Sequence, residues 1–522
     1  MKKIKIQLTI KEIAGLFLFY IVLLVCWGYQ FGDGDLIQLD PLVLSMTDDS
    51  LYANDFYVQH ANEHFPNERS FFLLLLTPFS NNIETASFVY HIIFSMLLLT
   101  GLFSISKLFI KNKLLLWFVL PVLFIPLINI NLGTNELYYP FLHPSLTAKA
   151  IGAWALYFWL QRKIIYAFIL VSLSTLQHPV VGIQLFLLLS AGEIFIFLFR
   201  KNERIKIKQT ITALIIYIST AGIFIISIQL RFRDSNVDHA LFYKIFFEFR
   251  NPHHYLPSSF SAVNWVVLVP LILLSCLIFQ KKNKYIFIFI CLAITGCVIY
   301  TIMTEIFHST AIAPIQWFKT TIWLEFFSVI GLAVSFELLL NSSINILLKR
   351  IISMTIGFAF LAIIIFIPIY KYQKMYTGYY NFPFNRKITP EIEISIKAKE
   401  LIPKNALFIQ PCNFTTLKYY GERSSLVDYK ALTHRKSFIL EWAKRFEDVY
   451  DLKIEESPIG LKTSMYANNK FKNLSADYIS QLQEKYGITH LLTFKTSKYP
   501  FPIIAQNEVY VIYEIEDQNT KR

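Results

Sequence analysis

Long apolar runs constrain the fold of this chain more than any other feature of its sequence, because they recur from its first residues to about residue 370. A straight helix needs about 20 predominantly apolar residues to cross a bilayer, and several runs approach or reach that length. Hydrophobic residues make up 55% of the 522 residues and charged residues only 16%, whereas an average soluble domain carries about 25% charged residues. The bilayer must therefore be the solvent for most of the chain.

The apolar runs predict an α-helical polytopic membrane protein with about eleven transmembrane helices. The predicted spans are residues 12–29, 86–110, 114–130, 146–160, 164–176, 180–199, 211–230, 263–279, 285–303, 320–340 and 351–370. Together they define a transmembrane domain over residues 1–370, which includes two long connections at residues 30–85 and 231–262.

Basic residues between the spans predict the orientation in the membrane. Lysine and arginine gather in alternate connections, namely residues 111–113, 162–163, 200–208, 281–284 and 349–350. By the positive-inside rule, these connections and the N-terminus face the cytoplasm, and residues 30–85 and 231–262 face outward. The formal net charge of +13 therefore reflects membrane topology, and it does not indicate a nucleic-acid partner.

Residues 371–522 are polar and charged, and they predict one soluble α/β domain. In TPEIEISIKAKEL, Thr389 is placed to cap a helix that begins with proline. ALFIQP is typical of a short strand, and PIIAQNEVYVIYEIE is typical of a hairpin. SADYISQLQEKYGITHLLTF predicts a helix that ends at Gly487, followed by a buried strand. Because an odd number of spans precedes this domain, we expect it to be extracytoplasmic.

The first outer connection, residues 30–85, is rich in acidic residues. Asp33 and Asp35 flank a glycine within six residues of the end of the first span. A pair of this kind at the membrane surface can bind a divalent cation such as Mg²⁺ or Mn²⁺, or can place one carboxylate as a general base. Asp48 and Asp55 are further acidic candidates in this connection, although a solvated acidic loop would explain most of its acidic residues.

The second outer connection contains FRNPHHYLPSSF, a basic stretch with two prolines. Arg231, Arg233 and Arg250 supply guanidinium groups, and His253 and His254 supply imidazoles. These groups suit a phosphate or pyrophosphate head group. The alternative interpretation is an amphipathic element at the membrane surface whose long side chains reach back to water.

Further polar residues are predicted at the outward-facing ends of the spans. His143 and His178 each precede a proline, and each either caps a helix or lines the rim of a shared cavity. Gln316 and Lys319 lie at the start of the tenth span. Glu325 lies deeper in that span, where a carboxylate requires a partner or a wet cavity.

This layout resembles the GT-C class of membrane glycosyltransferases, which use sugars carried on polyprenyl phosphate. Asp33 and Asp35 in FGDGDL match the position and type of the acidic pair that follows the first span in that class, although the commoner form is an adjacent Asp-Glu pair. The resemblance implies an inverting transferase with these aspartates as catalytic residues. It also implies a polyprenyl-phosphate sugar donor in the bilayer and an envelope glycan, lipid or protein as acceptor.

Several stretches also resemble a family of uncharacterised bacterial polytopic proteins. They are DDSLYANDF, LHPSLTAKA, LQHPVVG, RNPHHYLP, IQWFK and GERSSLVDYKALTHRKSFILEWAKR. This resemblance implies a multi-pass protein of the bacterial cytoplasmic membrane, and it carries no substrate with it.

Three other functions fit the same features. A polysaccharide polymerase or ligase would have a large outer loop between its spans, whereas the soluble part of this chain lies after the last span. A transporter or flippase of lipid-linked sugars predicts charged residues along the midplane and paired broken helices, and the sequence contains no internal repeat. A non-catalytic assembly protein with a GT-C-like fold stays open, because fold does not determine function.

Overall fold

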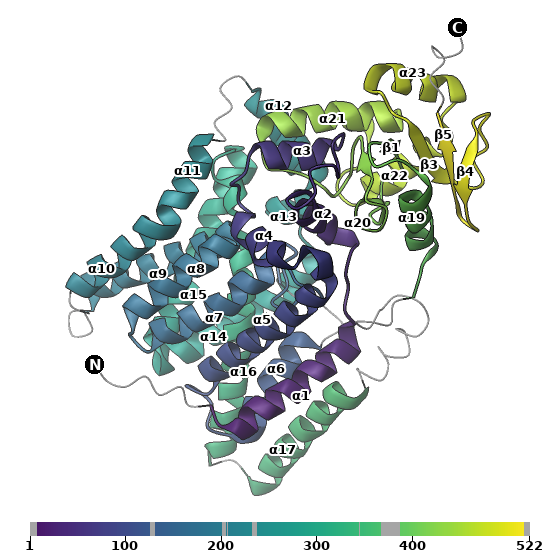
Figure 1. The fold of residues 1–522 in the computed structure, drawn as a ribbon. Coiled ribbons are helices and arrows are strands. Elements are labelled where there is room, and N and C mark those ends of the chain that lie inside the picture. The colour runs from purple at the N-terminus through teal and green to yellow at the C-terminus, as the bar shows by residue number, and fades with distance from the viewer. Residues whose placement is uncertain are drawn as a thin grey trace. The chain divides into compact units, whose positions relative to one another are not determined.

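The computed structural model describes residues 8–125, 131–200, 205, 207–231, 237–343, 345–366 and 387–515. Figure 1 shows the helices and strands, coloured along the chain. The chain packs into two compact units. The first, here called the helical unit, comprises Met1–Gln30, Ser87–Ser227 and His253–Asn385. The second, here called the mixed unit, comprises Phe31–Ala86, Ile228–Pro252 and Arg386–Arg522. Each unit is described separately below.

Every predicted span contains a helix. The helices are α1 (Ile10–Trp27), α5 (Ile83–Ser106), α6 (Lys113–Phe124), α7 (Pro144–Leu160), α8 (Ile164–Gln177), α9 (Pro179–Phe199), α10 (Ile207–Tyr217), α11 (Ile223–Arg231), α14 (Ala262–Lys282), α15 (Lys284–Thr301), α16 (Thr321–Asn341) and α17 (Ile346–Leu361). Within the described part of the chain, seven helical stretches are long and apolar enough to cross a membrane. The chain is therefore a membrane protein, and the total of eleven crossings stays a prediction.

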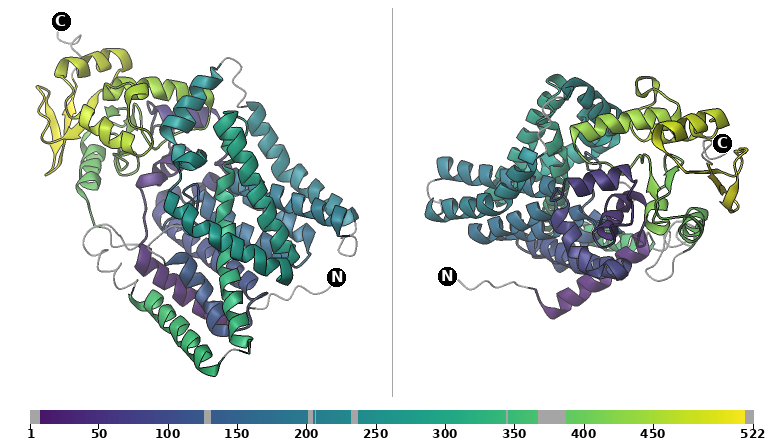
Figure 2. Two further views of the ribbon diagram at one scale, coloured as in Figure 1. Left: turned by 180° about the vertical axis from the view of Figure 1, so that it is seen from behind. Right: turned by 45° about the horizontal axis from the view of Figure 1, so that its top comes forward.

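The core of the helical unit forms around α7 and the first half of α16. Nearly every residue of α7 is buried, and so are residues Thr321–Gly331 of α16. Close helix packing explains part of this burial: a Cβ atom on Gly182 would come within 2.3 Å of the Thr175 backbone, so only glycine fits between α8 and α9. Both views in Figure 2 show the helices of this unit packed alongside one another.

The mixed unit contains a five-stranded sheet of order β2-β1-β3-β5-β4. The strands are β1 (Leu407–Ile409), β2 (Ser424–Ser425), β3 (His490–Phe494), β4 (Ile503–Gln506) and β5 (Tyr510–Glu514). β1 pairs in parallel with β2 and β3, and β5 pairs antiparallel with β3 and β4. We call residues 387–515 the C-terminal segment. Besides the strands it contains the helices α19 (Pro390–Leu401), α20 (Leu417–Tyr420), α21 (Lys436–Tyr450), α22 (Lys462–Phe471) and α23 (Ala476–Tyr486).

The local predictions for this segment are confirmed. The Thr389 side chain accepts from the Ile392 N–H at the start of α19, and the following proline is the first residue of the helix. Gly487 ends α23 with a φ of 68°, a left-handed conformation that glycine adopts without strain. The predicted hairpin is β4–β5, which appears with β3 as the yellow strands of Figures 1 and 2.

The first long connection from Phe31 onward, and the second as far as Pro252, also belong to the mixed unit. The first forms η1 (Gly34–Gln38), α2 (Asp40–Ser45), α3 (Phe56–Glu63), α4 (Ser70–Leu76) and η2 (Thr77–Asn82), and the second forms α12 (His239–Tyr243) and η5 (Lys244–Arg250). Hydrogen bonds hold them to the C-terminal segment: the Tyr52 hydroxyl donates to the Lys418 carbonyl at 2.5 Å, and the Gly460 N–H donates to the Phe249 carbonyl at 2.7 Å.

Candidate functional site

The two predicted catalytic aspartates lie at the start of η1 in the mixed unit. Asp33 is the residue before η1, and Asp35 lies in its first turn. Gly34, between them, has a φ of 60°, a conformation that favours glycine. The Gly34 N–H donates to the Thr415 hydroxyl at 3.1 Å. The turn that spaces the two carboxylates is therefore attached to the C-terminal segment.

Asp35 lies beside one cationic side chain and within electrostatic reach of a second. Its Oδ1 atom is 3.0 Å from Lys430 Nζ, and the two side chains are 52% and 40% exposed. Arg250 is buried, and its guanidinium lies 3.6 Å from the centre of the Tyr429 ring. Burial lowers the pKa of Arg250, and attraction by Tyr429 and Asp35 offsets part of that shift. Because arginine stays protonated in proteins, Asp35 has a permanent positive charge nearby.

Arg250 is held in place by the residue next to Lys430. Its Nε and Nη2 atoms donate to the Tyr429 carbonyl at 3.0 and 2.5 Å, and Nη1 donates to Asn251 at 3.1 Å. We call Asp35, Arg250, Tyr429 and Lys430 the Asp35 cluster. It brings together predicted residues from both outer connections, and it adds two residues that the sequence did not single out individually.

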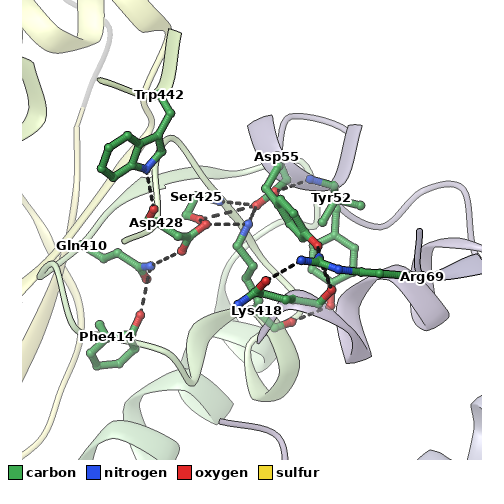
Figure 3. Close-up of polar contacts among 12 residues, drawn as sticks. Tyr52, Asp55, Arg69, Gln410, Phe414, Lys418, Ser425, Asp428 and Trp442 are labelled. Carbon is green, nitrogen blue, oxygen red and sulfur yellow. Dashed lines mark hydrogen bonds and ion pairs between the residues drawn. The ribbon is translucent and has the colours of Figure 1, made fainter. Parts of the chain in front are cut away.

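Asp55, a further acidic candidate, lies in a different environment. It is fully buried and caps α3 by accepting from the Val58 N–H at 2.9 Å. Lys418 Nζ lies between Asp55 and Asp428, at 2.8 Å from the Asp428 carboxylate (Figure 3). Burial alone would lower the pKa of Lys418, but the two carboxylates raise it above its ordinary value. We call Asp55, Lys418 and Asp428 the buried triad.

Asp48 is an exposed acid that pairs with the C-terminal segment. Its carboxylate lies 3.0 Å from Lys404 Nζ and accepts from the Ser50 N–H at 2.9 Å. Hydrogen bonds from Ser50 and Lys404 lower the pKa of Asp48 to about 2. Arg231 also belongs to the mixed unit and donates to the Phe65 carbonyl at 3.3 Å, whereas Arg233 lies outside the described residues.

Two of the predicted histidines of the helical unit, His143 and His178, serve as helix caps. His143 Nδ1 accepts from the Ser145 N–H at 3.2 Å, and His178 Nδ1 accepts from the Val181 N–H at 3.4 Å. Their rings are 6.5 Å apart between centroids. The capping interpretation is therefore confirmed, and the two caps also lie near each other.

A buried lysine that the sequence did not single out lies near these caps. Lys149 is fully buried in α7, and its Nζ donates to Asn135 Oδ1 at 2.7 Å and to the Glu136 carbonyl. The Tyr139 ring lies 4.6 Å from Lys149 Nζ and 5.2 Å from the His143 ring centre. A lone lysine within the apolar run LHPSLTAKA is the sequence signal that identifies it.

The segment around residues 131–139 links most of the other predicted residues of the helical unit. The Thr134 hydroxyl is 2.5 Å from His254 Nδ1, and the rings of His254 and His253 are 4.2 Å apart between centroids. The Lys319 carbonyl accepts from Asn135 at 3.2 Å, and the buried Glu325 hydrogen-bonds with the Asn131 side chain.

Gln316 is held by other elements of the helical unit. Its Nε2 donates to the Tyr255 hydroxyl at 2.8 Å, and its carbonyl accepts from Gln184 at 2.9 Å. The predicted residues thus form two groups. Asp33, Asp35, Asp48, Asp55, Arg231 and Arg250 lie in the mixed unit, and His143, His178, His253, His254, Gln316, Lys319 and Glu325 lie in the helical unit.

The predicted cation site at Asp33 and Asp35 consists of two carboxylates, one of which is paired with a lysine. Among the described residues, no three His, Cys, Asp or Glu side chains are arranged to hold a metal ion. A cation at Asp35 would also have to displace the Lys430 ammonium, 3.0 Å away. A divalent cation at this pair stays a prediction, and no chemical step below depends on it.

Comparisons with known proteins identify the fold. A family model described as a domain of unknown function (DUF6798) matches residues 390–449. No curated protein sequence matches the chain. The crystal structure of the Archaeoglobus fulgidus oligosaccharyltransferase in the apo form is similar to this chain with a TM-score of 0.52 and 10% sequence identity. The similarity covers 94% of this chain and 70% of that one, so the chain has a fold of the GT-C type.

Proposed function

We propose that this protein is a membrane glycosyltransferase that transfers a sugar from a polyprenyl-phosphate-linked donor to an envelope glycan, lipid or protein. One observation carries the proposal: Asp35, just after the first apolar helix, lies 3.0 Å from Lys430 and within electrostatic reach of the buried Arg250. A carboxylate that interacts with two cations supplies both charges that glycosyl transfer from a phosphate requires. The similarity of the fold to an oligosaccharyltransferase supports the same proposal.

The proposed reaction is a single displacement at the anomeric carbon. The acceptor hydroxyl oxygen forms a bond to that carbon while the bond from the carbon to the phosphate oxygen breaks. The Asp35 carboxylate takes the hydroxyl proton as general base, and polyprenyl phosphate leaves with the electron pair of the broken bond. Attack opposite the leaving group inverts the anomeric configuration.

The two cations have different proposed roles. Lys430 is 40% exposed, so its flexible side chain can move from Asp35 to the departing phosphate. Arg250 is fixed by its bonds to the Tyr429 carbonyl and acts as a stationary positive charge that stabilises the developing negative charge. Asp33 is the alternative base, since it lies in the same turn.

The apolar helices suit the lipid part of such a donor, because a polyprenyl chain stays in the bilayer. The basic connections at residues 111–113 and 281–284 favour a cytoplasmic N-terminus and an extracytoplasmic C-terminal segment. We therefore propose that transfer takes place on the outer face of a bacterial cytoplasmic membrane. A tag after the last residue should react with membrane-impermeant reagents in intact spheroplasts, and reactivity only after lysis would contradict this orientation.

The reaction is tested with purified protein and a panel of radiolabelled polyprenyl-phosphate hexoses. General-base catalysis contributes roughly 10²- to 10⁴-fold, so Asp35→Asn should reduce turnover at least about a hundredfold. Asp48→Asn removes the same charge from an exposed ion pair in the same connection and should leave turnover unchanged.

Three results would contradict the proposal. Full turnover in both Asp35→Asn and Asp33→Asn would remove these residues from the mechanism. Donor binding without turnover by the wild type, across the acceptors tested, would favour a non-catalytic assembly protein. Movement of the donor across vesicle membranes without product would favour a flippase.

A further inference from the structure

A pocket in the mixed unit contains charged side chains that the proposed reaction does not use. It lies between α3, the residues that follow α3, and the residues that precede α21. Its chemistry comes from three histidines, two arginines and one glutamate: His60, His64, His434, Arg69, Arg435 and Glu68. We call it the histidine pocket. Residues 433–435, which form one wall, belong to the segment that matches the family of unknown function.

The charged groups that line the histidine pocket leave an excess of positive charge. Arg69 and Arg435 stay protonated at all physiological pH values, so the lining carries one net positive charge with neutral histidines. Burial raises the pKa of Glu68, but His434 and Arg69 outweigh it and lower the value to about 2. Glu68 is therefore ionised and offsets only one of the two arginines.

Two charged groups next to the lining, Glu63 and Arg231, have opposite signs. Glu63 attracts Arg435 from outside the pocket. Arg231 donates to the carbonyl of Phe65, the residue after His64, at 3.3 Å and supplies a compensating positive charge. Each histidine that takes up a proton would add to the excess.

Part of the lining of the histidine pocket is held in place without a ligand. Arg69 Nη2 donates to Gln38 Oε1 at 2.6 Å and to the Leu432 carbonyl at 3.2 Å, which holds its positive charge in one place. His60 in α3 and His64, the residue that follows α3, stack with ring centroids 4.5 Å apart. His64 Nδ1 contacts the His60 carbonyl at 2.7 Å. Arg69, His60 and His64 therefore lose little conformational freedom on binding.

These charges distinguish among possible ligands. A metal ion would be repelled by two permanent guanidinium charges, and the described residues contain no three side chains arranged to hold one. A neutral sugar would use the hydrogen-bonding groups but gain nothing from the charge excess. Guanidinium groups pair strongly with phosphate and carboxylate oxygens, so an anionic group is the ligand that fits.

We infer that the histidine pocket binds an oxyanion, either a phosphate ester or the carboxylate of an acidic sugar. The proposal does not depend on the transferase reaction, because the pocket shares no residue with the Asp35 cluster. It gives the C-terminal segment and the first connection a joint binding role, since each contributes one wall.

The test uses three ligands built on one sugar: glucose 1-phosphate, glucuronic acid and glucose. Each is titrated calorimetrically into the full-length protein in detergent at pH 7. We expect saturable binding of at least one of the two anions, and the preference between them identifies the source of the oxyanion. Glucose should bind at least about tenfold more weakly, since a charge-assisted hydrogen bond contributes about 1.5–3 kcal/mol.

Two substitutions that should change the affinity for the anion in opposite directions make the test independent of folding defects. Arg435→Gln should weaken anion binding about tenfold, whereas Glu68→Gln should strengthen it, which a damaged protein cannot do. Lys397→Gln, which removes one positive charge from α19 outside the pocket, should change nothing. No binding of either anion, equal binding of glucose, or anion binding that both pocket variants leave unchanged would each overturn the proposal.

Discussion

Two aspartate–lysine pairs in the mixed unit join the same two segments of chain in opposite environments. Asp35 and Lys430 are 3.0 Å apart, and about half of each side chain is exposed to solvent. Asp55 and Lys418 are fully buried, and Asp428 and Ser425 complete their contacts. In each pair the aspartate comes from the first connection and the lysine from the C-terminal segment.

Burial, and not residue type, decides which of the two pairs has a structural role and which is available for chemistry. A half-exposed pair gains little from its attraction, typically 0 to about 1 kcal/mol, so either partner can leave it to meet a substrate. A buried pair has lost its water, and removal of one partner leaves an uncompensated charge in a medium of low dielectric constant. The buried triad is therefore costly to break, whereas the Asp35 cluster is available for reaction.

The largest expected effect is on the buried triad. Lys418→Met leaves the carboxylates of Asp55 and Asp428 facing each other without a cation, and loss of one partner from a buried pair costs about 3–5 kcal/mol. The free energy of unfolding of the mixed unit, measured by urea denaturation in detergent, should fall by that amount. Lys430→Met makes the same change at the exposed pair and should alter it by less than about 1 kcal/mol. Equal losses of unfolding free energy in the two variants would show that burial does not distinguish the two pairs.

A smaller effect is expected on the reaction itself. Lys430→Gln removes the mobile cation that the proposal assigns to the departing phosphate, so turnover should fall about tenfold, the equivalent of one charge-assisted hydrogen bond. Lys430→Arg keeps the charge and should retain most of the turnover. Turnover is measured as the initial rate with the labelled donor. A rate unaffected by Lys430→Gln would contradict the role of Lys430 and leave Arg250 as the only assigned cation.

The last prediction concerns the pH dependence of stability at a buried histidine that lies near a positive charge, Arg423. His490 in β3 stacks against Phe408, and burial lowers its pKa from 6.5 to about 4. Because the unfolded chain takes up the proton first, the stability of the mixed unit should decline as the pH falls from about 6.5 towards 4. His490→Gln should flatten this part of the pH profile of unfolding. An unchanged slope would show that other groups cause it.

Much of the local structure could be predicted from the sequence. The Thr389 cap, the end of a helix at Gly487 and the β4–β5 hairpin depend on neighbouring residues, so short-range patterns identify them. Each apolar run that was predicted to span the membrane likewise contains a helix. These features follow from backbone geometry and burial, which act over a few residues.

The candidate site was predicted in part. Asp35 and Arg250 were both selected by residue type and position, and they lie within electrostatic reach of each other. Lys430 was missed because a lysine in a polar domain carries no signal of its own, and its partner lies 395 residues away. Lys149 was missed for a different reason, since its polar partners come from the irregular segment around residues 131–139.

The sequence by itself determined that the chain belongs in a membrane, where its helices lie, and which residues carry charge. Only the tertiary structure decided which charges lose contact with water. Asp35 and Asp55 are the same chemical group twenty positions apart, and no short-range pattern distinguishes them. Their environments differ because segments more than 360 residues away close over one carboxylate and leave the other partly exposed.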